Sequence, residues 1–174
     1  MEYTFTLKYR LAAHDCDAQE LVERLGETGC DDALVGVGQP GRLALEFTRE
    51  APTARAAFHS ALTDVKRIVP SAQLIEASPD FVGLTDVADL IGVSRQNMRK
   101  LMLTHVASFP AAVHEGSAST WHLAEVLDWL DARGGYELEP GLAETARAAQ
   151  AINVATAVRG LPLKAVRELR TLLA

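Results

Sequence analysis

The sequence predicts an α+β protein in three parts, and three patterns along its 174 residues support this prediction. Apolar and polar residues alternate at the start of the chain, which is typical of a half-buried strand. Two short stretches with helical spacing then flank a glycine, and an alanine-rich stretch near the end favours helices. We therefore expect an α+β domain at 1–79, a second domain at 80–133 and C-terminal helices at 134–174.

The first domain is expected to begin with a strand and a helix. Apolar residues occupy every second position from 3 to 11, which indicates the strand. Residues 17–28 fit a helix, because Leu21 and Leu25 fall one turn apart on the same side. A second strand is expected at 33–37, where small and branched apolar residues follow one another.

The second half of this domain adds a strand, a helix and a last strand. The glycine and proline turn at 38–41 leads into a strand at 42–48, which indicates a hairpin. Residues 52–69 fit a helix with Pro52 in its first turn. The residues expected to face inward from this helix are Ala56, Ala57, Leu62, Val65 and Ile68. With a final strand at 72–77, the order of elements is that of a ferredoxin-like sandwich.

The middle of the chain carries the most informative pattern, two short helices around a glycine turn at 84–101. We expect Thr85 to cap the first helix and Ala88 to let the second helix cross closely. Gly92 supplies the backbone freedom of a tight turn. Ser94 is expected to cap the second helix, whose polar side chains would point outward. These outward residues are Arg95, Gln96, Asn97, Arg99 and Lys100.

The segment after these helices extends the pattern. Residues 108–113 are expected to be an extended strand, 114–117 a turn, and 119–122 a returning strand before an amphipathic helix. Together with the Ala-x-x-x-Gly-x-Ser spacing from 88 to 94, this arrangement resembles the winged helix-turn-helix of the MerR, excisionase and AlpA-like phage regulators. The resemblance covers about fifty residues, 83–133.

The resemblance implies that the helix at 94–102 enters the major groove of double-stranded DNA. Arg95 and Arg99 suit guanine edges or phosphates, and Gln96 and Asn97 suit adenine edges. Lys100 suits a phosphate. The remaining expected contacts are to the DNA backbone from Thr85 and Ser94, and to the minor groove from His114 and Ser117 on the wing.

The charge balance departs from a strongly DNA-binding domain. Residues 83–133 hold four basic and six acidic side chains, the wing has no Lys or Arg, and the whole chain has a formal net charge of −6. Phosphate neutralisation supplies most non-specific affinity, so we expect weak binding by one copy. Three of the four positive charges lie on the second helix, however, and a homodimer reading two half-sites would bind usefully.

Other functions find less support in the sequence. No set of nucleophile, base and orienting residue is recognisable, so an enzyme is not expected, and neither a cofactor nor a metal is expected. Cys16 and Cys30 are expected to be reduced thiols. No membrane segment or signal peptide is recognisable, which predicts a cytoplasmic protein.

The N-terminal domain could dimerise, sense a small ligand or bind a protein, and acidic residues in its loops could bind a cation or cap helices.

The sequence therefore predicts a dimeric, sequence-specific transcriptional regulator of bacterial or phage origin, expected to act as a repressor. Two alternatives stay open. One is an antitoxin-like protein that binds a partner protein, through the N-terminal domain or the C-terminal helices, and autoregulates through DNA. The other is an excisionase-like architectural factor that bends DNA. For the C-terminal helices, packing on the chain's own domains competes with pairing to a two-fold partner.

Overall fold

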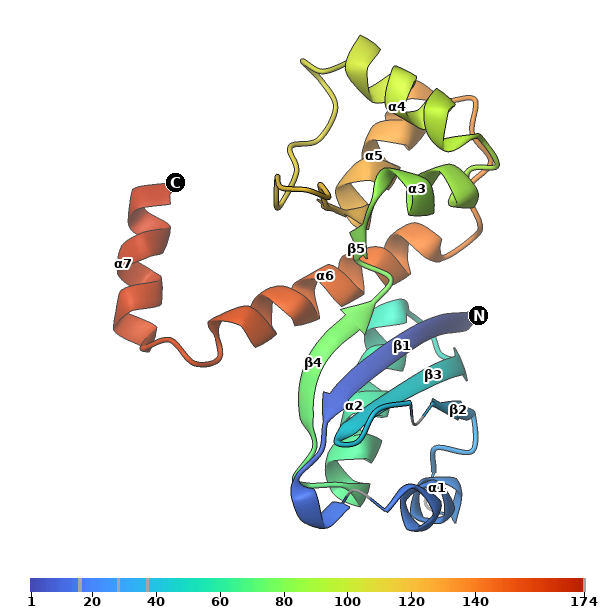
Figure 1. Ribbon diagram of the computed structural model, residues 1–174, viewed down its shortest axis with the longest axis vertical. Coiled ribbons are helices and arrows are strands. Elements are labelled where there is room, and N and C mark those ends of the chain that lie inside the picture. The colour runs from blue at the N-terminus through green and yellow to red at the C-terminus, as the bar shows by residue number, and fades with distance from the viewer. Residues whose placement is uncertain (16, 28, 37, 174) are drawn as a thin grey trace.

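The protein has a mixed α+β architecture, seen in a computed structural model that describes residues 1–15, 17–27, 29–36 and 38–173. Within these ranges it contains a four-stranded antiparallel sheet, a small two-stranded sheet and seven α-helices (Figure 1). The large sheet lies at one end of the molecule and the small sheet with its helices at the other, and helix α6 passes between them.

The large sheet has the strand order β2-β3-β1-β4, with every neighbouring pair antiparallel. Its strands are β1 (Glu2–Arg10), β2 (Ala33–Gly36), β3 (Arg42–Glu50) and β4 (Gln73–Ser78). The alternation predicted for β1 is confirmed, because its odd-numbered residues from 3 to 9 are buried. Phe5 pairs with Phe47 of β3 in the register of the sheet. The centroid of its ring lies 4.0 Å from that of Phe58, which packs the sheet against a helix.

Helices α1 (Ala18–Glu27) and α2 (Ala54–Ile68) supply the apolar side chains that cover the buried face of this sheet. The start of α2 corrects the prediction. Thr53 is the N-cap, since its hydroxyl accepts a 3.1 Å hydrogen bond from the Ala56 amide, and Pro52 therefore precedes the helix. Ala56 is exposed, not inward, because Ala57 and Phe58 already occupy the buried side of that turn.

Three sequence predictions cannot be followed to their full extent. The expected end of the first helix at Thr28, the expected end of the second strand at Val37 and the thiol of Cys16 lie outside the described residues. Between β1 and α1 the chain forms one short 3-10 turn, Ala13–Asp15.

A second apolar core forms around the small sheet. That sheet pairs β5 (Phe81–Val82) with β6 (Trp121–His122), and the helices around it are α3 (Leu84–Leu90), α4 (Arg95–Thr104) and α5 (Leu123–Arg133). Val87, Ala88, Met98 and Leu127 are almost completely buried in this core. Burial of Ala88 and Met98 confirms the predicted close crossing of two helices at this point.

The strand predicted at 108–113 is wrong. Pro110 has no amide hydrogen to donate to a sheet, and its carbonyl oxygen instead accepts a 3.1 Å hydrogen bond from the Trp121 indole. Directly after residues 108–113, an isolated bridge joins His114 to Thr120. The partner of β6 is β5.

Helix α6 (Leu142–Val158) belongs to both cores. Ala149 is buried among the residues of the large sheet, whereas Ala146 is buried with the helices of the small one. The helix after it, α7 (Leu163–Leu173), has no buried residue and stands apart from the body of the molecule (Figure 1). The two C-terminal helices thus differ: α6 packs on its own chain, and α7 does not.

A buried polar cluster joins α6 to both sheets. The Asn153 side chain exchanges two hydrogen bonds with the Ala77 backbone, of 2.7 and 2.8 Å, and donates a third, of 2.7 Å, to the Asp80 carboxylate. The other Asp80 carboxylate oxygen lies 2.7 Å from Nδ1 of His122 on β6. Because Asp80 and Asn153 are only 1% and 6% exposed, this cluster fixes where the two sheets meet on α6.

Candidate nucleic-acid interface

The two helices of the predicted motif are joined by a tight turn at Gly92. This glycine has a φ of +69°, a left-handed conformation that other residues rarely adopt. The turn is closed by a 2.9 Å hydrogen bond from the Val93 amide to the Ala88 carbonyl. The Val93 side chain is partly buried and packs against the core of these helices.

Of the two predicted helix caps, one is confirmed and the other is wrong. The Ser94 hydroxyl accepts a 3.2 Å hydrogen bond from the Asn97 amide, which confirms it as the N-cap of α4. Thr85 is not a cap. It lies exposed in the first turn of α3, whose N-cap is Gly83, and the Asp86 carboxylate accepts a 2.7 Å hydrogen bond from the Gly83 amide. The sequence does contain a signal for Gly83 as the cap: Asp86 follows it by three residues, and an acid at that position can accept a hydrogen bond from the amide of the cap residue.

The outer face of α4 carries the predicted polar residues. Met98 is fully buried and anchors the helix, and all five of the polar side chains predicted to point outward are exposed. With 3.6 residues per turn, Gln96, Lys100 and Leu103 lie most nearly opposite Met98. Arg99 lies beside them, whereas Arg95 and Asn97 occupy the two flanks of the helix.

Leu103 is a surface residue that the sequence reasoning missed. It is 56% exposed near the centre of the outer face, and Val106 just beyond the helix is 74% exposed. The spacing of five residues between Met98 and Leu103 contains the signal, because it turns the side chain to the opposite side of a helix. An apolar side chain among polar ones can contact the methyl group of thymine.

The electrostatics of this face are more favourable than the net charge suggests. Among the described residues, Arg95, Arg99 and Lys100 have no ion pair or side-chain hydrogen bond. Two of the six acidic residues of the segment are engaged with α6 instead. Glu125 accepts a 3.1 Å hydrogen bond from Gln150, and Asp128 forms an ion pair with Arg147. These two acids are held on α5 by their contacts with α6.

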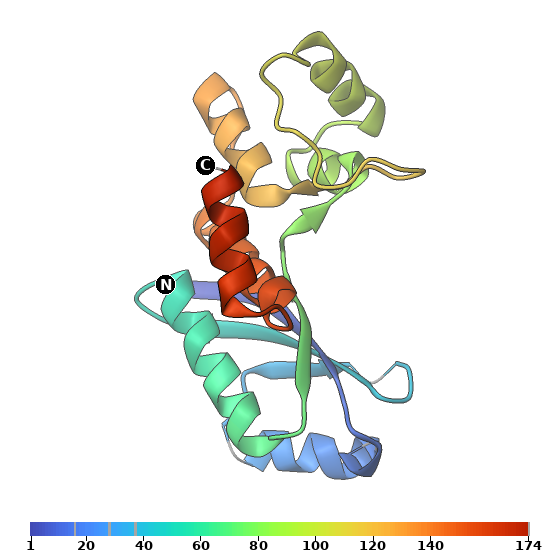
Figure 2. The same cartoon turned by 90° about the vertical axis from the view of Figure 1, so that its left-hand side faces the viewer.

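The predicted wing is a short hairpin that projects from the body of the molecule (Figure 2). Thr120 and His114 bridge it, with a 3.0 Å hydrogen bond from the Thr120 amide to the His114 carbonyl. The side chains of His114 and Ser117 are both exposed on it. Its one charged side chain is Glu115, so the hairpin offers hydrogen-bonding groups without a fixed positive charge.

An aromatic cluster fixes the base of this hairpin to α5. Phe109 is buried between the rings of Trp121 and Trp129, whose centroids lie 5.9 and 5.0 Å from its own, both edge-on. Trp129 also donates a 3.3 Å hydrogen bond to the Ser108 hydroxyl and lies beneath the Arg133 guanidinium. The hairpin is therefore carried on a rigid base.

The N-terminal domain provides no competing chemical centre among the residues that the structure describes. No group of three histidine, cysteine or acidic side chains there is arranged to hold a metal ion. Two loop carboxylates are engaged: Asp15 with Arg24, and Asp32 with Arg49, whose pKa is raised by the Asp32 and Asp64 carboxylates. These two acids therefore serve structural contacts.

Burial also accounts for the thiol of Cys30. The side chain is 2% exposed in the first core, and burial raises its pKa to about 11, with a smaller contribution from the Asp64 carboxylate. A thiol in this state is a poor nucleophile at neutral pH.

None of the helices in the described ranges has both the length and the apolar character needed to cross a membrane.

Function must be inferred here from geometry and residue chemistry. Comparisons with protein-family models, with curated proteins and with solved structures find no match to this chain. The strongest assembled feature is α4, which is anchored by a buried methionine, capped by a serine and covered on its outer face by unpaired cations and amides.

Proposed function

We propose that this protein is a dimeric, sequence-specific DNA-binding regulator that places α4 in the major groove. Two finer fold assignments belong to the proposal. The strand order β2-β3-β1-β4, with two helices against one face, supports a ferredoxin-like N-terminal domain. The α3–α4 turn followed by a bridged hairpin and α5 supports a winged helix-turn-helix at about 83–133.

The observation that carries the proposal is the composition of the outer face of α4. A solvent-exposed helix normally pairs its charges or surrounds them with opposite ones. Here Arg99 and Lys100 stand unpaired beside Gln96, and no acidic residue occurs within α4. Arginine and glutamine are the side chains that recognise guanine and adenine edges by paired hydrogen bonds.

The geometry suggests how the contacts divide. Gln96, Arg99 and Leu103 would face the floor of the groove, where Gln96 suits an adenine edge and Leu103 a thymine methyl. Lys100, whose flexible side chain ends in a positive charge, would contact a phosphate. Arg95 and Asn97 on the flanks would reach the two groove walls, and His114 and Ser117 on the hairpin would approach the neighbouring minor groove.

The experiment that tests this function is selection of bound duplexes from a random DNA pool, followed by binding to the selected site at several salt concentrations. We expect a two-fold symmetric site whose half-sites lie about one DNA turn apart, and an affinity that falls as salt rises. Replacing Arg99 or Gln96 with alanine should weaken specific binding by about tenfold or more.

The matched control is Arg10→Ala, which removes an exposed arginine from β1, at the far end of the molecule from α4. It should leave specific binding within about twofold of the unaltered protein. If no sequence is enriched at low salt, or if Arg10→Ala and Arg99→Ala have equal effects, α4 does not recognise DNA bases.

A second candidate function is binding of a partner protein, as in an antitoxin-like protein, and α7 favours it. Three of its leucines, Leu163, Leu172 and Leu173, are 77–84% exposed, which is unusual for an isolated helix in water. Sedimentation of the purified chain and of Leu172→Asp separates the two cases. A dimer that becomes a monomer on substitution supports self-association through α7. A chain that is monomeric with and without the substitution supports binding of a different protein by α7.

A further inference from the structure

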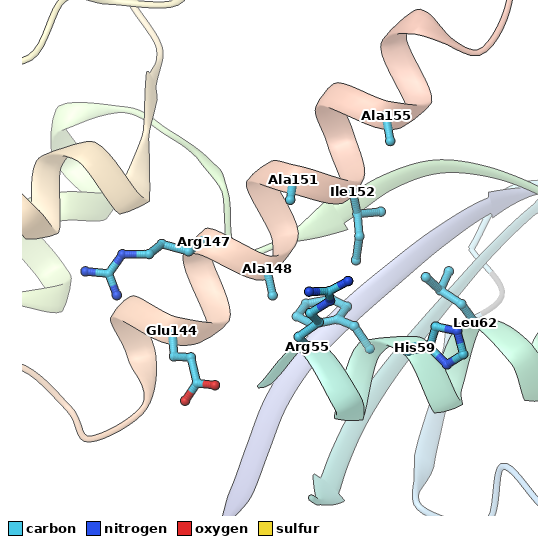
Figure 3. Close-up of a pocket in the computed structure, with 10 residues that line it drawn as sticks. Arg55, His59, Leu62, Glu144, Arg147, Ala148, Ala151, Ile152 and Ala155 are labelled. Atoms are coloured by element: carbon cyan, nitrogen blue, oxygen red, sulfur yellow. The ribbon is translucent and has the colours of Figure 1, made fainter. Parts of the chain in front are cut away.

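A cavity of about 490 Å³ lies between α2 and α6 (Figure 3). Its volume falls in the range of about 300–1,000 Å³ that is usual for small-molecule sites. Apolar side chains from both helices form most of its wall: Phe58, Leu62, Ala148, Ala151, Ile152 and Ala155.

Two basic side chains of α2 line the mouth of the cavity. Arg55 and His59 lie one turn apart on α2, and neither side chain has a partner among the described residues. Figure 3 shows the Arg55 guanidinium between the two helices, beside Ala148. A guanidinium beside an apolar wall suits an anionic group attached to a hydrocarbon body.

The other two charged residues of the lining are already engaged. The Glu144 carboxylate accepts hydrogen bonds of 2.9 Å from the Tyr3 hydroxyl and from the Ala54 amide at the start of α2. Arg147 points away from the cavity towards α5, where it pairs with Asp128. Arg55 is therefore the basic side chain left to meet a ligand, with the imidazole of His59 beside it.

We propose that this cavity binds a small amphipathic carboxylate, with its hydrocarbon body against the alanines of α6 and its carboxylate on Arg55 and His59. The exposed helix α7 of a second copy is a poorer occupant. It carries Lys164, Arg167 and Arg170 against a single acid, Glu168, so it would bring an excess of basic side chains to Arg55. This site stands independently of DNA binding.

The test is calorimetric titration of the full chain, without DNA, with sodium decanoate and with 1-decanol, which has the same hydrocarbon chain but no carboxylate. We expect decanoate to bind with one-to-one stoichiometry, and decanol to bind at least about tenfold more weakly. Ala151→Trp, which fills the cavity from the α6 side, should abolish decanoate binding. Arg55→Gln should weaken it by about tenfold or more.

The matched control is Lys66→Gln, which removes one positive charge from α2 outside the cavity lining and should change decanoate affinity by less than about twofold. Three results would overturn the proposal: equal binding of decanoate and decanol, unchanged binding by both cavity variants, or an equal loss with Lys66→Gln. It would also be overturned if decanoate failed to bind and Ala151→Trp converted a dimer to a monomer, since a second copy would then occupy the cavity.

Discussion

Asn153 is the residue on which the joint between the two sheets depends. Its amide satisfies both backbone groups of Ala77 and one oxygen of Asp80, in a place where water has little access. A buried polar group that loses its partner costs the full free energy of its desolvation. The side chain therefore contributes more to stability than an exposed amide with the same number of hydrogen bonds.

We expect Asn153→Ala to lower the free energy of unfolding by about 3 kcal/mol, because it leaves both backbone groups of Ala77 and one Asp80 carboxylate oxygen without their partner. Urea denaturation followed by circular dichroism measures the change. Gln150→Ala, one turn earlier on α6, removes a hydrogen bond to the exposed Glu125 and should cost less than about 1 kcal/mol. Equal effects of the two substitutions would show that the buried cluster is not specially stabilising.

Cys30 gives the stability of the protein a dependence on alkaline pH. In the unfolded chain a thiol ionises near pH 8.5, whereas burial holds the Cys30 thiol protonated up to a pKa of about 11. The folded state therefore binds more protons between these values, and the free energy of unfolding should fall as pH rises from about 8.5 to 11.

The measurement is the free energy of unfolding of the unaltered protein and of Cys30→Ala from pH 7 to 10. The stability difference between them should be constant below about pH 8. Above that it should shrink, with a slope that approaches about 1.4 kcal/mol per pH unit. A pH-independent difference would mean that the thiol titrates alike in both states.

At the scale of the element, α4 separates a stabilising face from a binding face. We expect Met98→Ala to cost about 3 kcal/mol of stability, since it removes a fully buried side chain from the second core. Leu103→Ala should change stability by less than about 0.5 kcal/mol but weaken binding to the selected DNA site. Thermal unfolding and DNA titration of both variants check this division, and a stable Met98→Ala variant would contradict it.

Helix and strand positions were largely predictable, because they depend on local spacing. The alternation in β1 and the Gly92 turn both follow from nearby residues. The failures have equally local causes. Thr85 looked like a cap, but Asp86 satisfies the Gly83 amide and lets the helix begin earlier, and Pro110 cannot donate to a sheet.

What the sequence could not predict is contact between distant segments. Nothing near Asp80 indicates that it will meet Asn153, 73 residues later, or that Glu144 will accept from Tyr3, 141 residues earlier. The cavity between α2 and α6 is a product of the same packing. The outward residues of α4 were predictable because one buried methionine sets the orientation of the whole helix.

At the scale of the whole molecule, α6 makes the two cores one cooperative unit. It contributes Ala149 to one core, Ala146 to the other and Asn153 to the joint between them. We expect a single unfolding transition, with the same midpoint by tryptophan fluorescence, which reports the second core, and by tyrosine absorbance, which reports chiefly the first.

Truncation before Gly160 provides the control, because it removes α7 and leaves α6 in place. Since α7 has no buried residue, the midpoint should move by only a few degrees. Truncation before Leu142 should abolish cooperative unfolding of both cores. Two separate transitions in the full chain would show that the cores are stable without their common helix.

The position of α6 after both sheets in the order of the chain also has a consequence for synthesis on the ribosome. The strands of the large sheet and the helices of the small one emerge first, yet each must wait for residues 142–158 before its apolar surface is covered. A nascent chain that ends before α6 therefore exposes two incomplete cores at once, the state in which chains aggregate or engage chaperones. Both cores are therefore completed by the same step, the packing of α6.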